Sequence, residues 1–260
     1  MKLNYKHRGQ GPPLVILHGL YGASDNWMSF AAKMSDTFSV FLPDLRNHGD
    51  SPHNNTFDYE VLANDVKEFI EQQRIVKPVI LGHSLGGKTA LFFALKYPLI
   101  AFSLIIADIS PRGYSDTDNP YILKHRQILT SLLEIDFNKV HSIRDAENQL
   151  MIKLNDKRLV GFLLKNIRKN PDGTYGLKLN ASAIYQNIEK TMTGIPEDSK
   201  IELPVMFIKG ENSDYIQEKD IIFIQEHFSN SFIQRIPNAG HWLHAEQPEE
   251  FLKTVRDFLG

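Results

Sequence analysis

Six short runs of apolar residues constrain the fold of this chain more than any other feature. Most of the runs are continuous rather than alternating, which is typical of strands whose two faces are both covered. Amphipathic stretches with helical spacing lie between them, for example at residues 59–73 and 88–96. This alternation predicts an α/β fold with a mostly parallel central sheet flanked by helices. The apolar runs occupy residues 14–17, 38–42, 79–81, 104–107, 205–208 and 232–236.

The alternation stops between residues 112 and 200. Several segments there have helical spacing, and residues 170–174 are typical of a tight turn between two short extended pieces. We therefore predict one core formed by residues 1–111 and 201–260, with a mainly helical cap of residues 112–200 inserted in it. The helical segments are residues 121–133, 143–153, 158–169 and 182–190.

Charge and cysteine content exclude several classes of function. The 260 residues carry 29 Lys and Arg against 31 Asp and Glu, so no basic excess suggests a nucleic-acid or membrane partner. Cysteine is absent, which excludes disulfides, thiolate metal sites and a cysteine nucleophile. Any covalent catalysis must then use oxygen or nitrogen. The beginning of the sequence lacks the apolar stretch of a signal peptide, so we expect a cytoplasmic protein.

A glycine-rich turn follows the third apolar run and fits two enzyme motifs at once. The pattern G-x-S-x-G is typical of a strained turn that raises a serine above the sheet at the start of a helix. The pattern G-x-x-x-x-G-K-[ST] is the phosphate-binding loop of NTPases, for which Asp108 at the end of the next apolar run could be the metal-binding acid. The turn reads Gly82-His83-Ser84-Leu85-Gly86-Gly87-Lys88-Thr89.

The rest of the chain favours the serine motif. A serine nucleophile needs a base, an acid that orients the base, and two N–H donors for the oxyanion. His241 lies in a loop directly after the last apolar run, where the base of such an enzyme is expected. The N–H groups of Leu20, after an early run, and of Leu85 would form the oxyanion hole. The NTPase interpretation of residues 82–89 explains none of these features and remains a remote alternative.

These motifs together resemble the α/β-hydrolases, along nearly the whole chain. Longer strings are similar to the YbfF-type esterases and their mitochondrial abhydrolase relatives, and they are more specific than G-x-S-x-G alone. The resemblance carries the family's nucleophile and base onto Ser84 and His241. The strings are residues 46–53, 86–88, 107–111 and 240–245.

The acid departs from the commoner hydrolase pattern. Most members have Asp three residues after the glycine that closes the penultimate strand, where this chain has Ser213, and Asp214 comes one residue late. In the YbfF-type subgroup the acid follows the strand after the nucleophile, and that position corresponds to Asp108. The resemblance thus favours Asp108 as the acid, with Asp214 as the alternative.

The resemblance implies hydrolysis of small carboxylic esters or acyl thioesters through an acyl-enzyme, without a cofactor or a metal. C–C bond hydrolysis and cofactor-free perhydrolysis occur on the same fold and remain alternatives. His241 and His244 are three residues apart, but no third metal ligand accompanies them in the sequence. We expect a small-molecule substrate and a monomer or homodimer.

Overall fold

A computed structural model describes residues 1–114 and 120–260. Within these residues the main sheet has seven strands in the order β1-β3-β2-β4-β5-β8-β9. All neighbouring pairs are parallel except β1 with β3, which confirms the predicted mostly parallel sheet. The strands are β1 (Tyr5–Arg8), β2 (Pro13–Leu17), β3 (Ser39–Pro43), β4 (Val79–His83), β5 (Ser103–Ala107), β8 (Val205–Gly210) and β9 (Ser231–Ile236).

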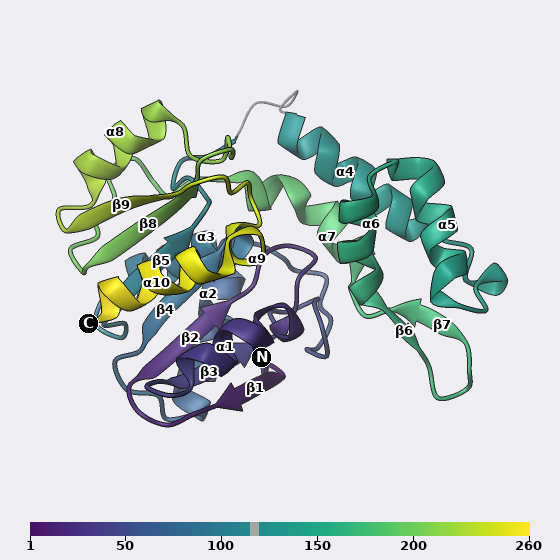
Figure 1. Cartoon of the computed structure of the whole chain (residues 1–260), viewed down its shortest axis with the longest axis horizontal. Helices are drawn as coiled ribbons and strands as arrows, with labels where there is room; N and C mark the ends of the chain where they lie inside the picture. The colour runs from purple at the N-terminus through teal and green to yellow at the C-terminus, as the bar shows by residue number, and fades with distance from the viewer. Residues whose placement is uncertain (115–119) are drawn as a thin grey trace.

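Helices cover both faces of this sheet (Figure 1). Leu14 and Ile16 of β2 pack in a cluster with α1 and α10, whereas Val15 and Leu17 point into the larger cluster that includes α2 and α3. Because both faces are buried, these strands read as unbroken apolar runs. The core helices are α1 (Met28–Met34), α2 (Tyr59–Gln72), α3 (Leu85–Lys96), α8 (Glu218–His227), α9 (Leu243–Glu246) and α10 (Pro248–Leu259), and a 3₁₀ helix spans Ser24–Trp27.

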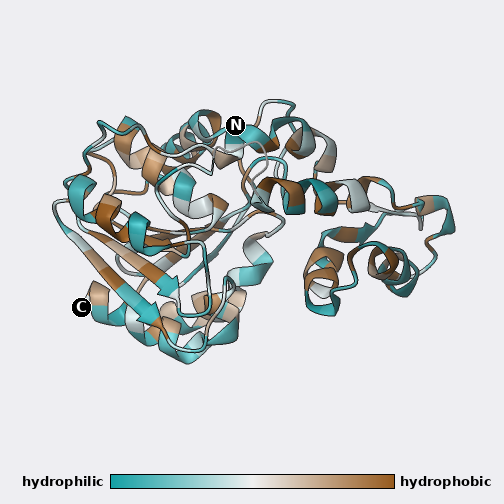
Figure 2. Ribbon diagram, turned by 90° about the horizontal axis from the view of Figure 1, so that it is seen from above, coloured by the Kyte–Doolittle hydropathy of each residue, from teal (hydrophilic) through white to brown (hydrophobic). Residues whose placement is uncertain are grey.

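The chain between β5 and β8 adds no strand to the main sheet within the described residues. We call residues 112–200 the inserted segment. Figures 1 and 2 show most of it as a lobe beside the lobe that holds the sheet, whose strands are largely brown in the hydropathy colours of Figure 2. Its elements are α4 (Pro120–Leu133), α5 (Ile143–Leu154), α6 (Lys157–Leu163), β6 (Ile167–Lys169), β7 (Tyr175–Leu177) and α7 (Ala181–Asn187), with 3₁₀ helices at Phe137–Lys139, Leu164–Asn166 and Ile188–Met192.

One boundary in the inserted segment depends on strand pairing rather than on helical spacing. The helix predicted for residues 158–169 ends at Leu163, because Ile167–Lys169 pairs with Tyr175–Leu177 as an antiparallel hairpin. The hairpin encloses the predicted turn at 170–174.

Among the described helices, none combines the length and the apolar character needed to cross a bilayer.

Close packing at Gly86 fixes how α3 crosses the end of β2. A Cβ atom added there would lie 2.2 Å from the carbonyl oxygen of Leu17, far inside van der Waals contact. Gly161, on α6, is the opposite case, because its added Cβ would meet nothing within 4 Å. Glycine at position 86 is therefore required for steric reasons, whereas at position 161 only helix propensity decides the effect of a side chain.

We expect Gly86→Ala to lower the free energy of unfolding by about 1–3 kcal/mol, because the helix must move away from β2. Gly161→Ala should instead raise it by about 0.5–1 kcal/mol, since alanine loses less backbone entropy in a helix. Urea denaturation followed by circular dichroism measures both. An unfolding free energy for Gly86→Ala equal to that of the unsubstituted protein would contradict the close-packing argument.

Candidate active site

Ser84 occupies the sharp turn between β4 and α3. Its φ of +53° is a strained conformation for a residue with a side chain. The turn is held by the Ser84 N–H, which donates to the carbonyl of Ala107 at 3.0 Å. It is also tight, because a Cβ on Gly82 would lie 2.3 Å from the carbonyl oxygen of Gly86. The turn leaves Ser84 partly exposed, and its side chain lines two cavities.

A hydrogen bond joins the side chains of His241 and Asp108. The His241 Nδ1 lies 2.8 Å from Oδ2 of Asp108, which is fully buried directly after β5. Because an ionised carboxylate only accepts, Nδ1 carries the proton and Nε2 is left with a lone pair. The second carboxylate oxygen accepts the N–H of Gly210 at 3.0 Å. The imidazole is thus held in one tautomer by a carboxylate that is itself fixed on both oxygens.

Asp214, the alternative acid, lies on the surface. Its backbone carbonyl accepts hydrogen bonds from Tyr121 and from Gln217, each at 3.3 Å. Of the two candidate acids, Asp108 is therefore the one whose carboxylate is hydrogen-bonded to His241.

Sequence reasoning did not assign a role to Ser213. Its hydroxyl donates to Oδ2 of Asp108, and its Oγ accepts from the N–H of Tyr215 at 3.3 Å. This is the position where most hydrolases of this pattern have the acid. The spacing from Gly210 marked the position, but only the fold brings its hydroxyl onto the carboxylate of another strand.

His18 supports the loop that carries Leu20. Its Nε2 accepts the N–H of Leu45 at 2.9 Å, so Nδ1 carries the proton and donates to the carbonyl of Gly19 at 2.9 Å. Burial lowers the pKa of His18, in keeping with a neutral ring. Leu20 and Leu85 both adjoin Ser84 along the smaller of its two cavities. Leu85 is the first residue of α3, where backbone N–H groups have no partner within the helix.

Two aromatic rings contact the imidazole of His241. Tyr215 stacks on it with ring centroids 3.8 Å apart and an interplanar angle of 17°. The His83 ring lies 4.8 Å from it between centroids and donates from Nε2 to the His241 carbonyl at 2.8 Å. Burial, reinforced by nearby His241, lowers the pKa of His83 well below its ordinary value and that of His244 to about 3. Both rings are neutral, so neither places a positive charge beside His241.

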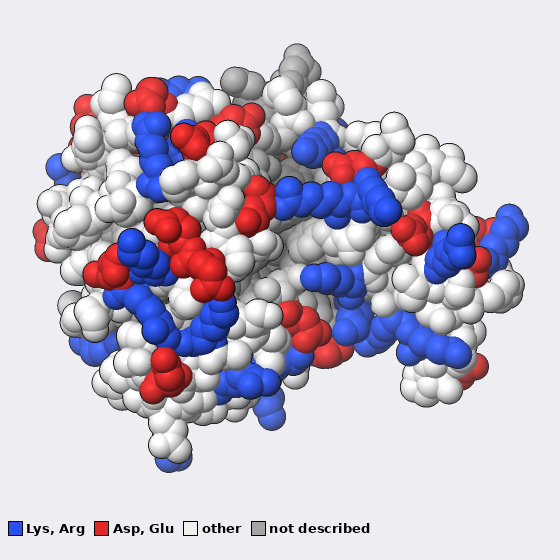
Figure 3. Space-filling view, viewed as in Figure 1, with Lys and Arg blue, Asp and Glu red and all other residues white. Residues whose placement is uncertain are grey.

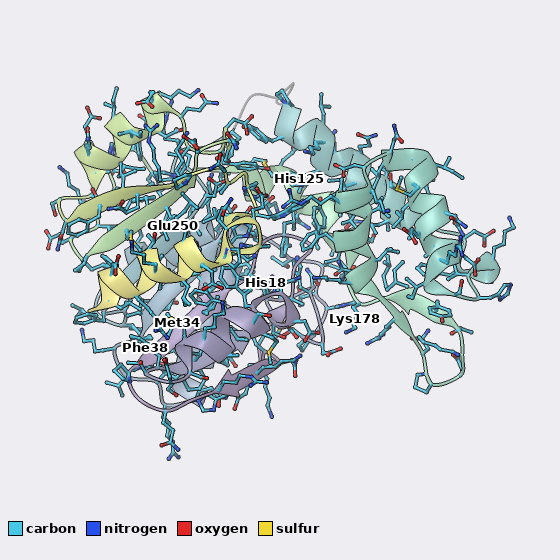
Figure 4. The ribbon with its side chains drawn as sticks, viewed as in Figure 1. His18, Met34, Phe38, His125, Lys178 and Glu250 are labelled. Carbon is cyan, nitrogen blue, oxygen red and sulfur yellow. The ribbon has the colours of Figure 1, made fainter. Side chains whose placement is uncertain are left out.

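Two cavities of very different size meet at Ser84. The larger, of about 410 Å³, is bounded by residues of the core and of α4 and α6 of the inserted segment. Figure 4 labels two of these residues, His18 at the end of β2 and His125 on α4, on opposite sides of the space between the lobes. The smaller cavity has a volume of about 20 Å³. The larger is lined by His241, Trp242, Leu159, Phe162 and Lys124 among others, and the smaller by Tyr59, Ile109, Tyr114, Thr191 and Met192 among others.

An ion pair bridges the two lobes beside the larger cavity. Arg158 of α6 lies 2.8 Å from the carboxylate of Glu246 and sits over the ring of Trp242. The same carboxylate accepts the backbone N–H groups of Gly240 at 2.6 Å and Trp242 at 3.3 Å. Glu246 therefore holds the chain on either side of His241. Figure 3 shows charged side chains of both signs along the hollow between the lobes.

The side chains of Lys88 and Thr89, which match the phosphate-loop motif, make hydrogen bonds inside the protein. Both residues are completely buried. The Lys88 ammonium donates to the backbone carbonyls of Arg112 and Thr193 at 2.7 Å each, and the Thr89 hydroxyl donates to Leu85 at 2.8 Å. Both side chains thus bind backbone carbonyls, whereas a phosphate loop would direct them toward an anion.

Within residues 1–114 and 120–260, no three His, Asp or Glu side chains gather as metal ligands. His244 instead stacks on Trp27, with ring centroids 4.2 Å apart. The histidine pair at 241 and 244 is therefore divided between two surroundings, one ring facing Asp108 and the other Trp27.

Comparison with known proteins identifies the family of this chain. The family model described as "alpha/beta hydrolase fold" matches residues 12–248. The chain belongs to the α/β-hydrolase family. Among curated members, it is 35% identical over 257 residues to the "sn-1-specific diacylglycerol lipase ABHD11" of zebrafish (Danio rerio), covering 97% of this chain and 80% of the relative.

Two further members of the family extend the comparison. "Esterase YbfF" of Escherichia coli (strain K12) is 27% identical over 264 residues, covering 100% of this chain and 99% of the relative. A solved structure named "Marine microorganism esterase" has a TM-score of 0.95 and 44% identity, and the match covers 99% of each chain. The predicted resemblance to the YbfF-type and abhydrolase relatives is confirmed.

Proposed function

We propose that this carboxylic ester hydrolase acts through a serine nucleophile and an acyl-enzyme intermediate, with Ser84, His241 and Asp108 as the catalytic triad. The observation that carries the proposal is the 2.8 Å hydrogen bond between His241 and buried Asp108, beside a cavity that Ser84 and His241 both line. That bond leaves Nε2 as the free basic nitrogen of the imidazole. The strained turn supports the same proposal, since it is typical of a nucleophilic serine.

In the first half of the reaction, the Ser84 hydroxyl attacks the acyl carbon and gives its proton to Nε2 of His241. The oxygen of the tetrahedral intermediate accepts the N–H groups of Leu20 and Leu85. His241 then returns the proton to the leaving oxygen, so the alcohol departs and the acyl-serine remains. In the second half, His241 takes a proton from water, which attacks the acyl-serine. When the intermediate collapses, His241 gives this proton to the Ser84 oxygen, so the carboxylic acid departs and the Ser84 hydroxyl and neutral His241 are restored. Asp108 stabilises the imidazolium in both halves.

The two cavities suggest which part of the ester lies on which side of Ser84. The leaving oxygen must face His241 to receive its proton, and His241 lines the cavity of about 410 Å³. The alcohol therefore occupies that cavity, under the inserted segment, which we propose to be a cap. The acyl group then occupies the cavity of about 20 Å³, which Leu20 and Leu85 also line.

The size of the acyl cavity supports a short acyl group. One water needs roughly 10–15 Å³ of such space, so about 20 Å³ admits a group near the size of a methyl. We therefore propose acetyl-like esters of larger alcohols as substrates. Acyl thioesters follow the same steps, since a thiolate leaves from the position of the alkoxide. The zebrafish relative is named a diacylglycerol lipase, and the small cavity directs our proposal toward shorter acyl chains.

Labelling by a fluorophosphonate probe tests the nucleophile. The unsubstituted protein should be labelled at Ser84 and should hydrolyse 4-nitrophenyl acetate, and Ser84→Ala should lose both properties while keeping its circular dichroism spectrum. Removal of the nucleophile leaves only the slow attack of water assisted by the remaining groups. A Ser84→Ala protein that retains full turnover would refute the proposal.

The two candidate acids can be compared directly. Asp108→Asn should reduce kcat on the order of 10⁴-fold, because the amide cannot hold the productive tautomer of His241. Asp214→Asn should reduce kcat by less than about two-fold, because its exposed carboxylate is not the one that holds His241. Steady-state kinetics with 4-nitrophenyl acetate measures both. The reverse order of effects would transfer the role of the acid to Asp214.

The acyl-side assignment predicts a change of chain-length preference. Met192→Ala should raise kcat/KM for 4-nitrophenyl butyrate relative to the acetate by about ten-fold, because removing a buried side chain from the small cavity makes room for two more methylenes. Phe162→Ala, which enlarges the other cavity, is the matched control and should leave that ratio unchanged. If Phe162→Ala alone shifts the ratio, the two sides are assigned the wrong way round.

A further inference from the structure

Lys88 is a buried amine that the proposed reaction does not use. It lies on α3 four residues after Ser84, and none of its surface is exposed. Removing a lysine from water is costly unless its N–H groups find partners. Here the two partners are backbone carbonyls, those of Arg112 and Thr193, each 2.7 Å from Nζ.

The two carbonyls belong to the two connections between the core and the inserted segment. Arg112 stands where the chain leaves the core, and Thr193 follows the last 3₁₀ turn before the chain returns. The connections run side by side, since the Tyr114 N–H donates to Met192 at 2.8 Å and the Ile195 N–H donates to Pro111 at 2.9 Å. We call these two paired connections the joint. The ammonium group of Lys88, which belongs to the core, thus binds both connections of the joint.

The joint also requires two glycines. A Cβ on Gly194 would lie 2.2 Å from the backbone nitrogen of Gly113, so the two connections touch backbone to backbone. Such close approach leaves the paired connections little freedom to slide past one another. Their position relative to α3 then depends on Lys88.

A chain of contacts leads from Lys88 to the proposed base. The ring of Tyr114 lies 4.7 Å from Nζ, in the geometry of a cation–π contact. The Tyr114 hydroxyl donates to the carbonyl of Tyr215 at 2.9 Å, and the Tyr215 ring stacks on His241. The joint of the inserted segment and the wall of the active site therefore share residues.

Among the residues that the structure describes, the acidic group that acts on this amine is Asp220 of α8. Asp220 also lies 3.7 Å from the guanidinium of Arg112. Burial lowers the pKa of Lys88 to about 7, with Asp220 opposing the shift. The charged and the neutral amine both keep at least two N–H groups, enough for the two carbonyls. The contacts to Arg112 and Thr193 thus do not need the charge.

From this geometry we propose that Lys88 is a positioning residue that fixes the inserted segment over Ser84 by binding both of its connections to α3. Its effect on the reaction is through the wall of the larger cavity, which α4 and α6 form, rather than through contact with the reacting atoms. This kinetic consequence rests on the proposed assignment of the alcohol to that cavity.

The test replaces Lys88 by methionine, which keeps the length and apolar stem of the side chain and removes its N–H donors. Lys96→Met, on the exposed side of the same helix, is the matched control. Two acetate esters separate positioning from general damage. The naphthyl group of 2-naphthyl acetate is large enough to contact the wall of the larger cavity, which includes Leu159 and Phe162, whereas the methyl group of methyl acetate is not.

For Lys88→Met we expect KM for 2-naphthyl acetate to rise about ten-fold, the equivalent of one or two lost hydrogen bonds, while kcat for methyl acetate stays within about three-fold. Lys96→Met should change neither constant. A residue that only maintained the fold would lower the rates with both esters alike. An equal loss with both esters, or no change with either, would overturn the proposal.

A distance measurement tests the same proposal without catalysis. The chain has no cysteine, so spin labels can be placed at Ile152→Cys on α5 and Leu99→Cys in the core, both highly exposed positions. We expect one narrow distance distribution by electron–electron dipolar spectroscopy, and a broadened or shifted one when Lys88→Met is added. An unchanged distribution would refute the positioning role, whatever the identity of the nucleophile.

Gly194→Ala is a second variant in case Lys88→Met does not fold. Its Cβ would force the two connections apart while Lys88 remains, so it should broaden the same distance distribution. A narrow, unshifted distribution in a folded Gly194→Ala protein would show that the joint does not determine the position of the inserted segment.

Discussion

The site depends on where the strands of the parallel sheet end. Carboxyl ends of parallel strands meet at one edge, so residues far apart in the chain become neighbours there. Ser84 follows β4, Asp108 follows β5, and Gly210 closes β8. The hydrogen bonds of Asp108 to His241 and to the Gly210 N–H join the ends of β5 and β8 to the loop after β9 through one buried carboxylate.

The buried carboxylate is also what distinguishes this chain within its family pattern. The position after β8 that carries the acid in most hydrolases carries Ser213 here, and the hydroxyl donates to Asp108. A serine can occupy this position because the carboxylate is supplied by Asp108 at the end of β5, the strand next to β8.

Two different kinds of contact hold the inserted segment against the core. At the joint, Lys88 binds backbone carbonyls in a buried setting, so its hydrogen bonds do not compete with water. Beside the larger cavity, Arg158 pairs with Glu246 where the guanidinium is exposed, and such pairs contribute little to stability. The buried joint is therefore the stronger of these two contacts.

Much of the fold was predictable because its signals are local. Apolar runs predicted β2, β3, β4, β5, β8 and β9. Most of the runs are continuous because strands buried on both faces have no polar alternation, whereas β9 is half exposed and contains Gln234 and Arg235. Edge strand β1 has the polar sequence Tyr-Lys-His-Arg and carries no such signal, so pairing with β3 alone defines it. The helix predicted for residues 158–169 is too long, because pairing across the turn at 170–174 makes Ile167–Lys169 a strand.

The sequence by itself determined the parallel α/β architecture, the strained turn at Ser84 and the histidine loop after the last strand. Each of these depends on residues that are close together in the sequence. Only the tertiary structure decided which carboxylate reaches His241, what Ser213 does and why Lys88 is buried. The resemblance favoured Asp108, but sequence separation alone does not show which carboxylate lies beside the histidine. Packing of β5 beside β8 brings one of them to the imidazole and leaves the other at the surface.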